Sequence, residues 1–186
     1  MRSETRAVSR ARSTRRRRYA FPVTDATPPL HPDLVALGPL LGAWRGNGSG
    51  SYPTVAPFGY TEHLYFGHDG RPFLTYDQRT RSLDDDRPLH AETGYLRPAG
   101  PGRAELVVAQ PTGVVEVDDG DVQMSDGVLR LVLRSRVVGL TTSATEITAV
   151  ERTVLLDGDV LHTTLAMAAV GQPLTHHLAS ELRRTG

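Results

Sequence analysis

The sequence predicts an all-β protein folded as a small antiparallel up-and-down barrel of about ten strands, with short helical pieces near its ends. Turn signals recur roughly every 8 to 12 residues between short apolar segments, which is typical of a sandwich or a barrel. Helices do not alternate with these strands, which argues against an α/β fold. A closed barrel has no edge strands, and one with about this number of strands has room for one small ligand.

The segment at residues 42–54 carries the strongest local signal. Trp44, the only tryptophan, fills the one gap in a series of glycines at every second position, namely Gly42, Gly46, Gly48 and Gly50. Residues two apart in a strand share a face, so one face of this strand is nearly bare. Glycine inside a strand usually marks close approach of a backbone, a bend or a ligand. We therefore expect the tight first strand of a barrel whose interior holds a ligand.

The other elements follow from the same pattern. Residues 31–41 mix proline with apolar residues and predict a short helix or 3-10 plug laid against the domain. After the first strand we expect strands over residues 58–66, 73–80, 90–97, 104–109, 114–117, 128–138, 145–156 and 160–169. Only residues 174–184 are predicted to be helical.

Composition limits the class of protein. A chain of 186 residues without cysteine is predicted to form one domain, and disulfides, thiolate metal sites and cysteine nucleophiles are excluded. Mean hydropathy is -0.29, and no apolar run approaches the roughly 18 residues of a membrane span. All 21 basic residues are arginine, which we interpret as the coding bias of a GC-rich genome.

The charge is unevenly distributed. The first 18 residues hold eight of the 21 arginines and one of the 21 acidic residues, so the remainder has 13 arginines against 20 acids. We interpret residues 1–30 as a disordered, arginine-rich tail and linker, followed by the domain at 31–186. Binding of the tail to nucleic acid or to an anionic surface is the alternative. The acidic domain argues against nucleic acid as its own partner. Residues 19–25 are too short and polar for a twin-arginine export signal, so we expect a cytoplasmic protein.

Most of the partial motif matches lack the other residues that the corresponding site requires. The glycine series lacks the residues and the following helix of a phosphate-binding loop. His90-Ala-Glu92 resembles half of a zinc deaminase motif, whose cysteines are absent, and on a strand His90 can face either the interior or solvent. His176 and His177 are predicted at the strand-to-helix junction, where neighbouring side chains point about 100° apart, so at most one faces the interior. The residues alone predict a ligand-binding β-barrel and no particular reaction.

Taken together, the motifs resemble those of the nitrobindin family of small haem-binding β-barrels, over residues 31–184. The first strand matches the family's Gly-x-Trp-x-Gly-x-Gly signature at Gly42, Trp44, Gly46 and Gly48 and runs on into Tyr-Pro-Thr at Thr54. Further matches are Pro88-Leu-His-Ala-Glu92, Gly94-Tyr-Leu-Arg97, Pro111-Thr-Gly113 with Glu116, Met167, Gln172-Pro-Leu174 and His177-Leu178.

The resemblance implies a ten-stranded barrel, similar to lipocalins and fatty-acid-binding proteins, with one haem b in its mouth. It implies that His177 is the proximal iron ligand and acts in catalysis through the iron, and that Thr54, Leu89, His90 and Met167 contact the haem. The implied activity is isomerisation of peroxynitrite to nitrate by the ferric form, together with binding of nitric oxide. Thr145 stands where related sequences often carry a lysine that can pair with a haem propionate.

Other functions stay open on the sequence. The barrel is alternatively a non-enzymatic haem or nitric oxide carrier or sensor, or a carrier of an apolar small ligand. An exposed barrel face is compatible with a homodimer, and the arginine-rich composition with an actinobacterial source.

Overall fold

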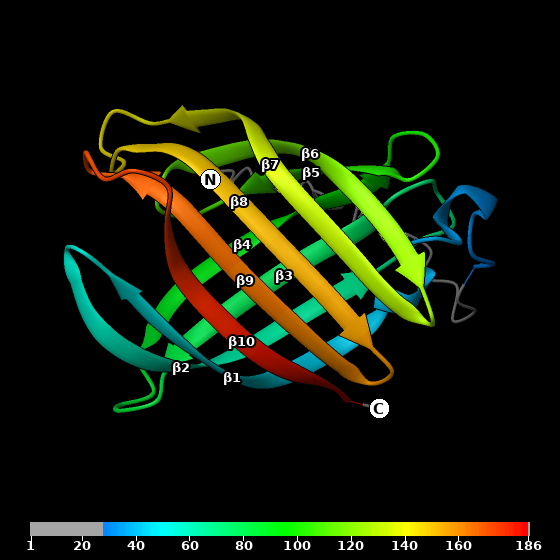
Figure 1. The fold of residues 1–186 in the computed structure, drawn as a ribbon, viewed down its shortest axis with the longest axis horizontal. Helices are drawn as coiled ribbons and strands as arrows, with labels where there is room; N and C mark the ends of the chain where they lie inside the picture. The colour runs from blue at the N-terminus through cyan, green and yellow to red at the C-terminus, as the bar shows by residue number, and fades with distance from the viewer. Residues whose placement is uncertain (1–27, 186) are drawn as a thin grey trace, which may run out of the picture.

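The computed structural model describes residues 28–185, which form a closed antiparallel barrel of ten strands (Figure 1). The strands are β1 Gly42–Tyr52, β2 Val55–Gly67, β3 Leu74–Ser82, β4 Pro88–Pro98, β5 Arg103–Ala109, β6 Val114–Ser125, β7 Val128–Leu140, β8 Ile147–Asp157, β9 Val160–Ala169 and β10 Thr175–Thr185. Each strand pairs with its neighbours in the sequence, and β10 closes the ring on β1. The predicted ten-stranded up-and-down barrel is confirmed.

The prediction of a C-terminal helix is wrong, because this segment is strand β10. Leu, Ala, Glu and Arg favour helices in isolation, but β10 pairs with β1 on one side and β9 on the other. The ladders of two neighbours outweigh a weak local preference. Ser180 and Leu182 are buried while Glu181 and Arg183 are exposed, so the period-two alternation of a strand is present in the sequence.

The glycines of β1 lie on the same inward side of the strand as the buried Trp44. A Cβ atom on Gly46 would collide with the backbone carbonyl of Glu181 on β10, and one on Gly48 would collide with the ring of Tyr60 on β2. The bare face of β1 thus lets a neighbouring backbone and an aromatic ring come close, which explains why glycine is needed.

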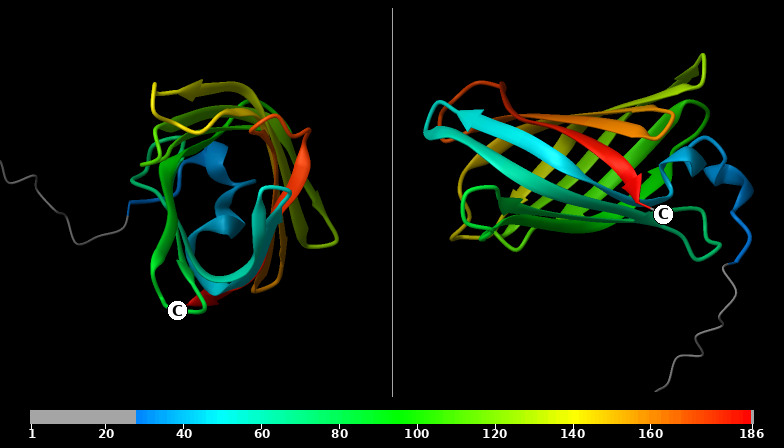
Figure 2. Two further views of the ribbon diagram at one scale, coloured as in Figure 1. Left: turned by 90° about the vertical axis from the view of Figure 1, so that its left-hand side faces the viewer. Right: turned by 90° about the horizontal axis from the view of Figure 1, so that it is seen from below.

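The predicted 3-10 plug is also confirmed. Two short 3-10 turns, η1 Pro32–Leu34 and η2 Gly38–Leu40, lie across one end of the ring of strands (Figure 2). Leu34 and Leu40 of these turns, and Leu37 between them, are fully buried in the core. Trp44 is also fully buried, and its indole Nε1 donates to the carbonyl of Leu40 at 2.8 Å. Trp44 therefore ties the plug to the first strand.

The arginine-rich part of the predicted tail lies outside the described residues, so its disorder stays a prediction. Of the predicted linker, Pro28 to Leu30 are described, and Leu30 packs against the core. Within residues 28–185, no helix has the length and apolar character needed to cross a membrane.

Candidate functional site

A large cavity opens at the barrel end opposite the plug, and we call it the mouth cavity. Its volume is about 670 Å³, within the range of roughly 300–1,000 Å³ that is usual for small-molecule sites. The turns β1–β2, β3–β4, β5–β6, β7–β8 and β9–β10 surround it and lie on the left in Figure 1. Both apolar and polar side chains line it, including Phe58, Leu89, Met167, Gln110 and Thr145.

His177 reaches this cavity from a β-bulge at the start of β10. His176 pairs with Ala166 and Leu178 with Leu165, so His177 is the extra residue between two successive pairs. A bulge bends the strand and redirects a side chain. It brings the His177 ring to the mouth cavity, edge-on to Tyr52 at 5.4 Å and to Phe58 at 6.2 Å between ring centroids.

The hydrogen bonding of His177 leaves one ring nitrogen free to bind a metal. Its Nδ1 lies 3.0 Å from the backbone carbonyl oxygen of Ser51. A carbonyl only accepts, so Nδ1 carries the proton and Nε2 keeps its lone pair. Burial lowers the pKa of His177, although the bond to Ser51 opposes this shift. The structure therefore presents a neutral imidazole fixed in one tautomer, which is the state in which histidine ligates metals.

Three further predicted site residues line the same cavity. Leu89 and His90 come from the start of β4 and Met167 from the end of β9, so they join His177 although they are far apart in the sequence. Thr54 differs: it lies exposed in the β1–β2 turn and is not among the cavity-lining residues, whereas its neighbour Val55 is. Contact of these four residues with a haem stays a prediction.

The orientation of His90, left open by the sequence, is decided by the structure. Its side chain lines the mouth cavity, and its Nε2 lies 3.4 Å from Oε2 of Glu92 two residues along β4. His90 therefore faces the interior.

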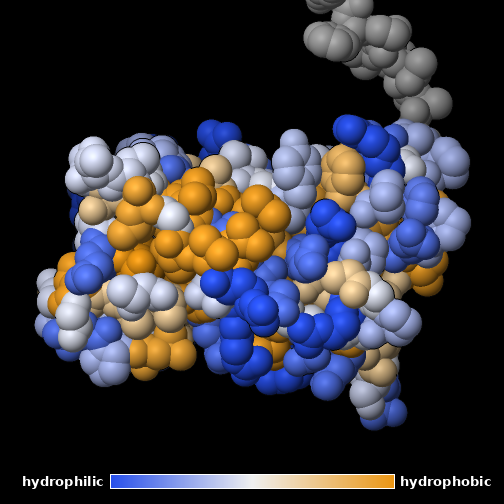
Figure 3. Space-filling model, turned by 90° about the horizontal axis from the view of Figure 1, so that it is seen from above, coloured by the Kyte–Doolittle hydropathy of each residue, from blue (hydrophilic) through white to orange (hydrophobic). Residues whose placement is uncertain are grey.

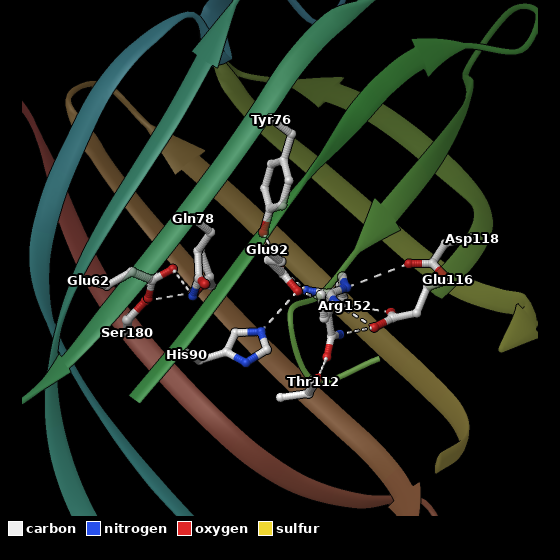
Figure 4. Close-up of polar contacts among 12 residues, drawn as sticks. Glu62, Tyr76, Gln78, His90, Glu92, Thr112, Glu116, Asp118, Arg152 and Ser180 are labelled. Carbon is white, nitrogen blue, oxygen red and sulfur yellow. Dashed lines mark hydrogen bonds and ion pairs between the residues drawn. The ribbon is translucent and has the colours of Figure 1, made fainter. Parts of the chain in front are cut away.

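Beneath the mouth cavity lies a buried layer of charged groups centred on Arg152 of β8 (Figure 4). The two terminal nitrogens of Arg152 donate to Glu92 at 2.7 and 3.1 Å, and one of them also donates to Glu116 at 3.0 Å. Its Nε lies 3.6 Å from the carboxylate of Asp118. We call Glu92, Glu116, Asp118 and Arg152, together with the nearby Glu62 and Gln78, the polar layer.

Sequence reasoning missed this layer as a unit. Glu92 and Glu116 were recognised only as family matches, and Asp118 and Arg152 not at all. A signal was present on β6, where Glu116 and Asp118 are buried while the flanking Val115 and Val117 are exposed. This is the reverse of the usual apolar-in, polar-out alternation of a strand.

The carboxyl groups of the polar layer are not equivalent. Burial alone would raise the pKa of Glu92, but Arg152 and hydrogen bonds from His90 and Tyr76 lower it to about 2. Asp118 is fully buried and its two carboxyl oxygens have no hydrogen-bond partner. Burial, with Arg152 opposing and Glu116 adding to the effect, raises the pKa of Asp118 to about 7. Burial also raises the pKa of Glu62, against hydrogen bonds from Ser180 and Gln78.

At the rim of the cavity, the cationic group differs from the one that the resemblance implies. Thr145 lines the mouth cavity in the β7–β8 turn, and Arg87 lines it in the β3–β4 turn. Arg152, the other arginine in the cavity wall, is occupied by Glu92 and Glu116. Arg87 has only an exposed ion pair with Asp85, at 3.3 Å, and such pairs are weak. It is therefore available to a carboxylate of a bound ligand.

The fold and the site together define a class: a ligand-binding β-barrel that offers one neutral imidazole to a metal held within a larger cofactor. An iron porphyrin suits this arrangement, since the macrocycle supplies four iron ligands and the chain needs to supply one. Residues 33–184 match the family model described as the THAP4-like, heme-binding beta-barrel domain. The chain belongs to this family, as the resemblance to nitrobindins predicted.

Named relatives and a solved structure agree with this assignment. The chain is 54% identical to a protein named peroxynitrite isomerase from Nocardia farcinica, over 83% of this chain and 92% of that protein. It is 52% identical to peroxynitrite isomerase 1 from Mycolicibacterium paratuberculosis, over 83% of this chain and 96% of that protein. The crystal structure of Rv2717c from M. tuberculosis shares 49% identity and superposes with a TM-score of 0.83, covering 85% of this chain and all of that one. These relatives come from actinobacteria.

Proposed function

We propose that this protein binds one haem b per chain in the mouth cavity and, in the ferric form, isomerises peroxynitrite to nitrate. The observation that carries the proposal is the free Nε2 of His177, on a neutral ring that faces a cavity of about 670 Å³. The printed names of the relatives support the reaction, and the description of the family supports the cofactor.

Each part of the cavity wall has a distinct role in this proposal. His177 supplies the protein ligand to iron, and the carbonyl of Ser51 fixes the direction of its ring. Leu89, Met167 and Phe58 offer apolar surface to the macrocycle. At the rim, Arg87 pairs with a propionate, and Thr54 closes the side nearest to the β1–β2 turn.

Bound haem would supply the Lewis acid that the reaction requires, because the cofactor carries the difficult chemistry. The chain controls what surrounds it. The polar layer holds more carboxyl groups than cations, so it opposes movement of an anion deeper into the barrel. Peroxynitrite and nitrate are both anions and are therefore kept in the mouth.

The test is a haem titration of the purified protein. We expect a Soret shift that saturates at one haem per chain, and a loss of affinity of at least about tenfold in His177→Ala. His176→Ala is the matched control, because this exposed neighbour is not placed on the cavity wall and should bind haem normally. Equal binding by His177→Ala would refute the haem site.

Stopped-flow decay of peroxynitrite then separates the enzyme from the alternatives. The ferric protein should accelerate formation of nitrate, whereas a haem or nitric oxide carrier or sensor would leave the rate unchanged. A carrier of an apolar ligand would show no Soret shift and would contain lipid after purification.

We also propose that the ferrous form binds nitric oxide at the same iron, that the protein acts in the cytoplasm and that it forms a homodimer.

The homodimer has structural support. Four apolar residues on the outer surface, Tyr95, Val107, Val117 and Val137, are each at least 40% exposed and pair side by side across β4 to β7. We call them the outer apolar face, and hydrophobic residues gather on this side of the barrel in Figure 3. Patches of this kind commonly mark protein interfaces.

A further inference from the structure

A second, smaller cavity lies deeper in the barrel, between the polar layer and the 3-10 plug. We call it the inner chamber, and its volume is about 60 Å³. The residues of its deep part are Leu64, Phe66, Leu96, Leu106, Leu131 and Leu133, each no more than 3% exposed. Glu62, Gln78 and Arg152 line the side that faces the polar layer. A cavity needs only roughly 10–15 Å³ to hold one water-sized molecule, so the inner chamber has room for a small guest.

The deep part of the inner chamber selects against charged and strongly polar guests. Polar side chains such as Tyr76 and Thr163 complete the wall, and their hydroxyls are already bonded to Glu92 and Ser180. The leucines and Phe66 offer no hydrogen bonds, and transfer of an unpaired polar group into such surroundings costs several kcal/mol, roughly 2–7. An anion would in addition have to pass the carboxylates of Glu92 and Glu116, which share the single cation Arg152. An uncharged diatomic molecule meets neither barrier.

The two cavities adjoin. Five residues line both of them: Tyr60, Gln78, Arg152, Leu165 and Leu178. At the other end of the barrel the buried leucines of the plug and Trp44 fill the interior. A gas molecule that enters the mouth cavity would therefore have only this shared wall to cross before it reaches the inner chamber.

We propose that the inner chamber is a docking site for one uncharged diatomic gas molecule, of the class of nitric oxide and dioxygen. The polar layer acts as its filter, since it admits neutral gas and holds anions in the mouth cavity. Gas docking is a property of the barrel itself. Only its use, as a store of ligand close to the iron, rests on the proposed haem function.

Xenon is the probe for the site, because it is small, uncharged and visible in electron density. Crystals of the full chain, both haem-free and haem-loaded, are pressurised with xenon. We expect one xenon atom in contact with Leu106 and Leu133 in both forms. Ordered water in the inner chamber, or xenon only in the mouth cavity, would overturn the proposal. Xenon in a chain that fails to bind haem would support gas docking and refute only the haem function.

The second test uses a substitution that fills the inner chamber with a larger side chain. Leu106→Phe places a larger side chain in the inner chamber, while Leu140→Phe makes the same change at an exposed position of β7 that lines neither cavity, where Leu140 is 43% exposed. In ¹²⁹Xe NMR titrations we expect xenon affinity to fall by at least about tenfold in Leu106→Phe and to stay unchanged in the control. If Leu106→Phe does not fold, Val154→Leu is the milder variant, because it adds one methylene group to the chamber wall and should give a smaller loss. Unchanged xenon affinity in a folded chamber variant would contradict the proposal.

The natural guests are distinguished by their magnetism. Dioxygen and nitric oxide are both paramagnetic and accelerate relaxation of nearby methyl groups. Each gas is added separately to the methyl-labelled, haem-free chain. We expect either gas to relax the methyl groups of Leu106 and Leu133 more than that of Met167 in the mouth cavity. Dioxygen carries two unpaired electrons and nitric oxide one, so the preferred guest is the gas whose effect saturates at the lower concentration, not the gas with the larger effect. Relaxation confined to Met167 would overturn the proposal.

Discussion

Arg152 is the residue on which the charge balance of the barrel interior depends. It is buried and binds Glu92 and Glu116 through its terminal nitrogens. Removing one partner from a buried ion pair usually costs about 3–5 kcal/mol, because the remaining charge is left without compensation. Arg152 therefore contributes to stability because it compensates the negative charge of the buried carboxylates.

Asp118 leads to a prediction about pH. Its pKa is raised to about 7, against about 4 in an unfolded chain. Between these values the folded protein keeps a proton that the unfolded chain releases, so Asp118 makes folding less favourable as pH rises and its full cost applies above about pH 7. Asp118→Asn should therefore raise the melting temperature at pH 8 and raise it less at pH 5, where only part of this cost applies.

Thermal unfolding at the two pH values checks this, with the exposed Asp157→Asn as the control. Glu92 does not obscure the result. Its pKa is lowered to about 2, so its contribution is present above its ordinary pKa and is lost only in strong acid. An equal shift at pH 5 and pH 8 would contradict the assignment to Asp118.

Arg87 leads to a prediction about retention of haem. If it pairs with a propionate at the rim, Arg87→Gln should release haem about fivefold faster, equivalent to about 1 kcal/mol, with less dependence on salt. Thr145→Lys should slow the release, because it adds a cation to the same cavity. Transfer of haem to an acceptor apoprotein measures both rates. Arg97→Gln, an exposed change on the outer side of β4, should have no effect, and a comparable effect there would count against a specific role for Arg87.

Among the elements, β1 and β10 determine the shape of the site. The bare face of β1 admits the Tyr60 ring and the β10 backbone, and the bulge in β10 turns His177 to the mouth cavity. The period-two pattern of the sequence explains the bare face of β1. The bulge in β10 breaks that period, and alternation alone does not predict the face on which an extra residue lies.

A substitution at Gly48 tests the close contact between β1 and β2. Gly48→Val should destabilise the fold by about 2 kcal/mol, since its Cβ would collide with the ring of Tyr60. Ser49 is the next residue along β1, and its side chain is exposed. Ser49→Val should therefore have little effect. Chemical denaturation measures both. Gly48→Val combined with Tyr60→Leu should recover part of the loss, and no recovery would argue that glycine is needed for another reason.

At the scale of the whole molecule, the outer apolar face carries the prediction of a homodimer. Val117→Asp places a charge at its centre, so the dimer should dissociate because burial of an unpaired carboxylate is costly. Sedimentation velocity measures the change. Thr164→Asp, an exposed position on β9, is the control and should stay dimeric. A wild-type monomer at high concentration would refute the dimer and leave the haem site unaffected.

The sequence by itself determined the elements and the family. Alternating side chains, glycines and turn residues act over a few neighbours, so nine of the strands, the 3-10 plug and the bare face of β1 follow from local patterns. The motifs also named Leu89, His90, Met167 and His177, which line the mouth cavity, and Thr54, which precedes the lining residue Val55. Their contact with haem stays a prediction.

Closure of the barrel decided the rest. It made the last segment a strand, because β1 on one side and β9 on the other supply its hydrogen bonds. It also brought Arg152 to Glu92, 60 residues away, and so allowed charged groups to lie inside. A buried charge is tolerated only when its partner is in place, and such partners come from strands that meet across the barrel. Local pattern assigns a residue to a face, but only the closed structure shows what that face meets.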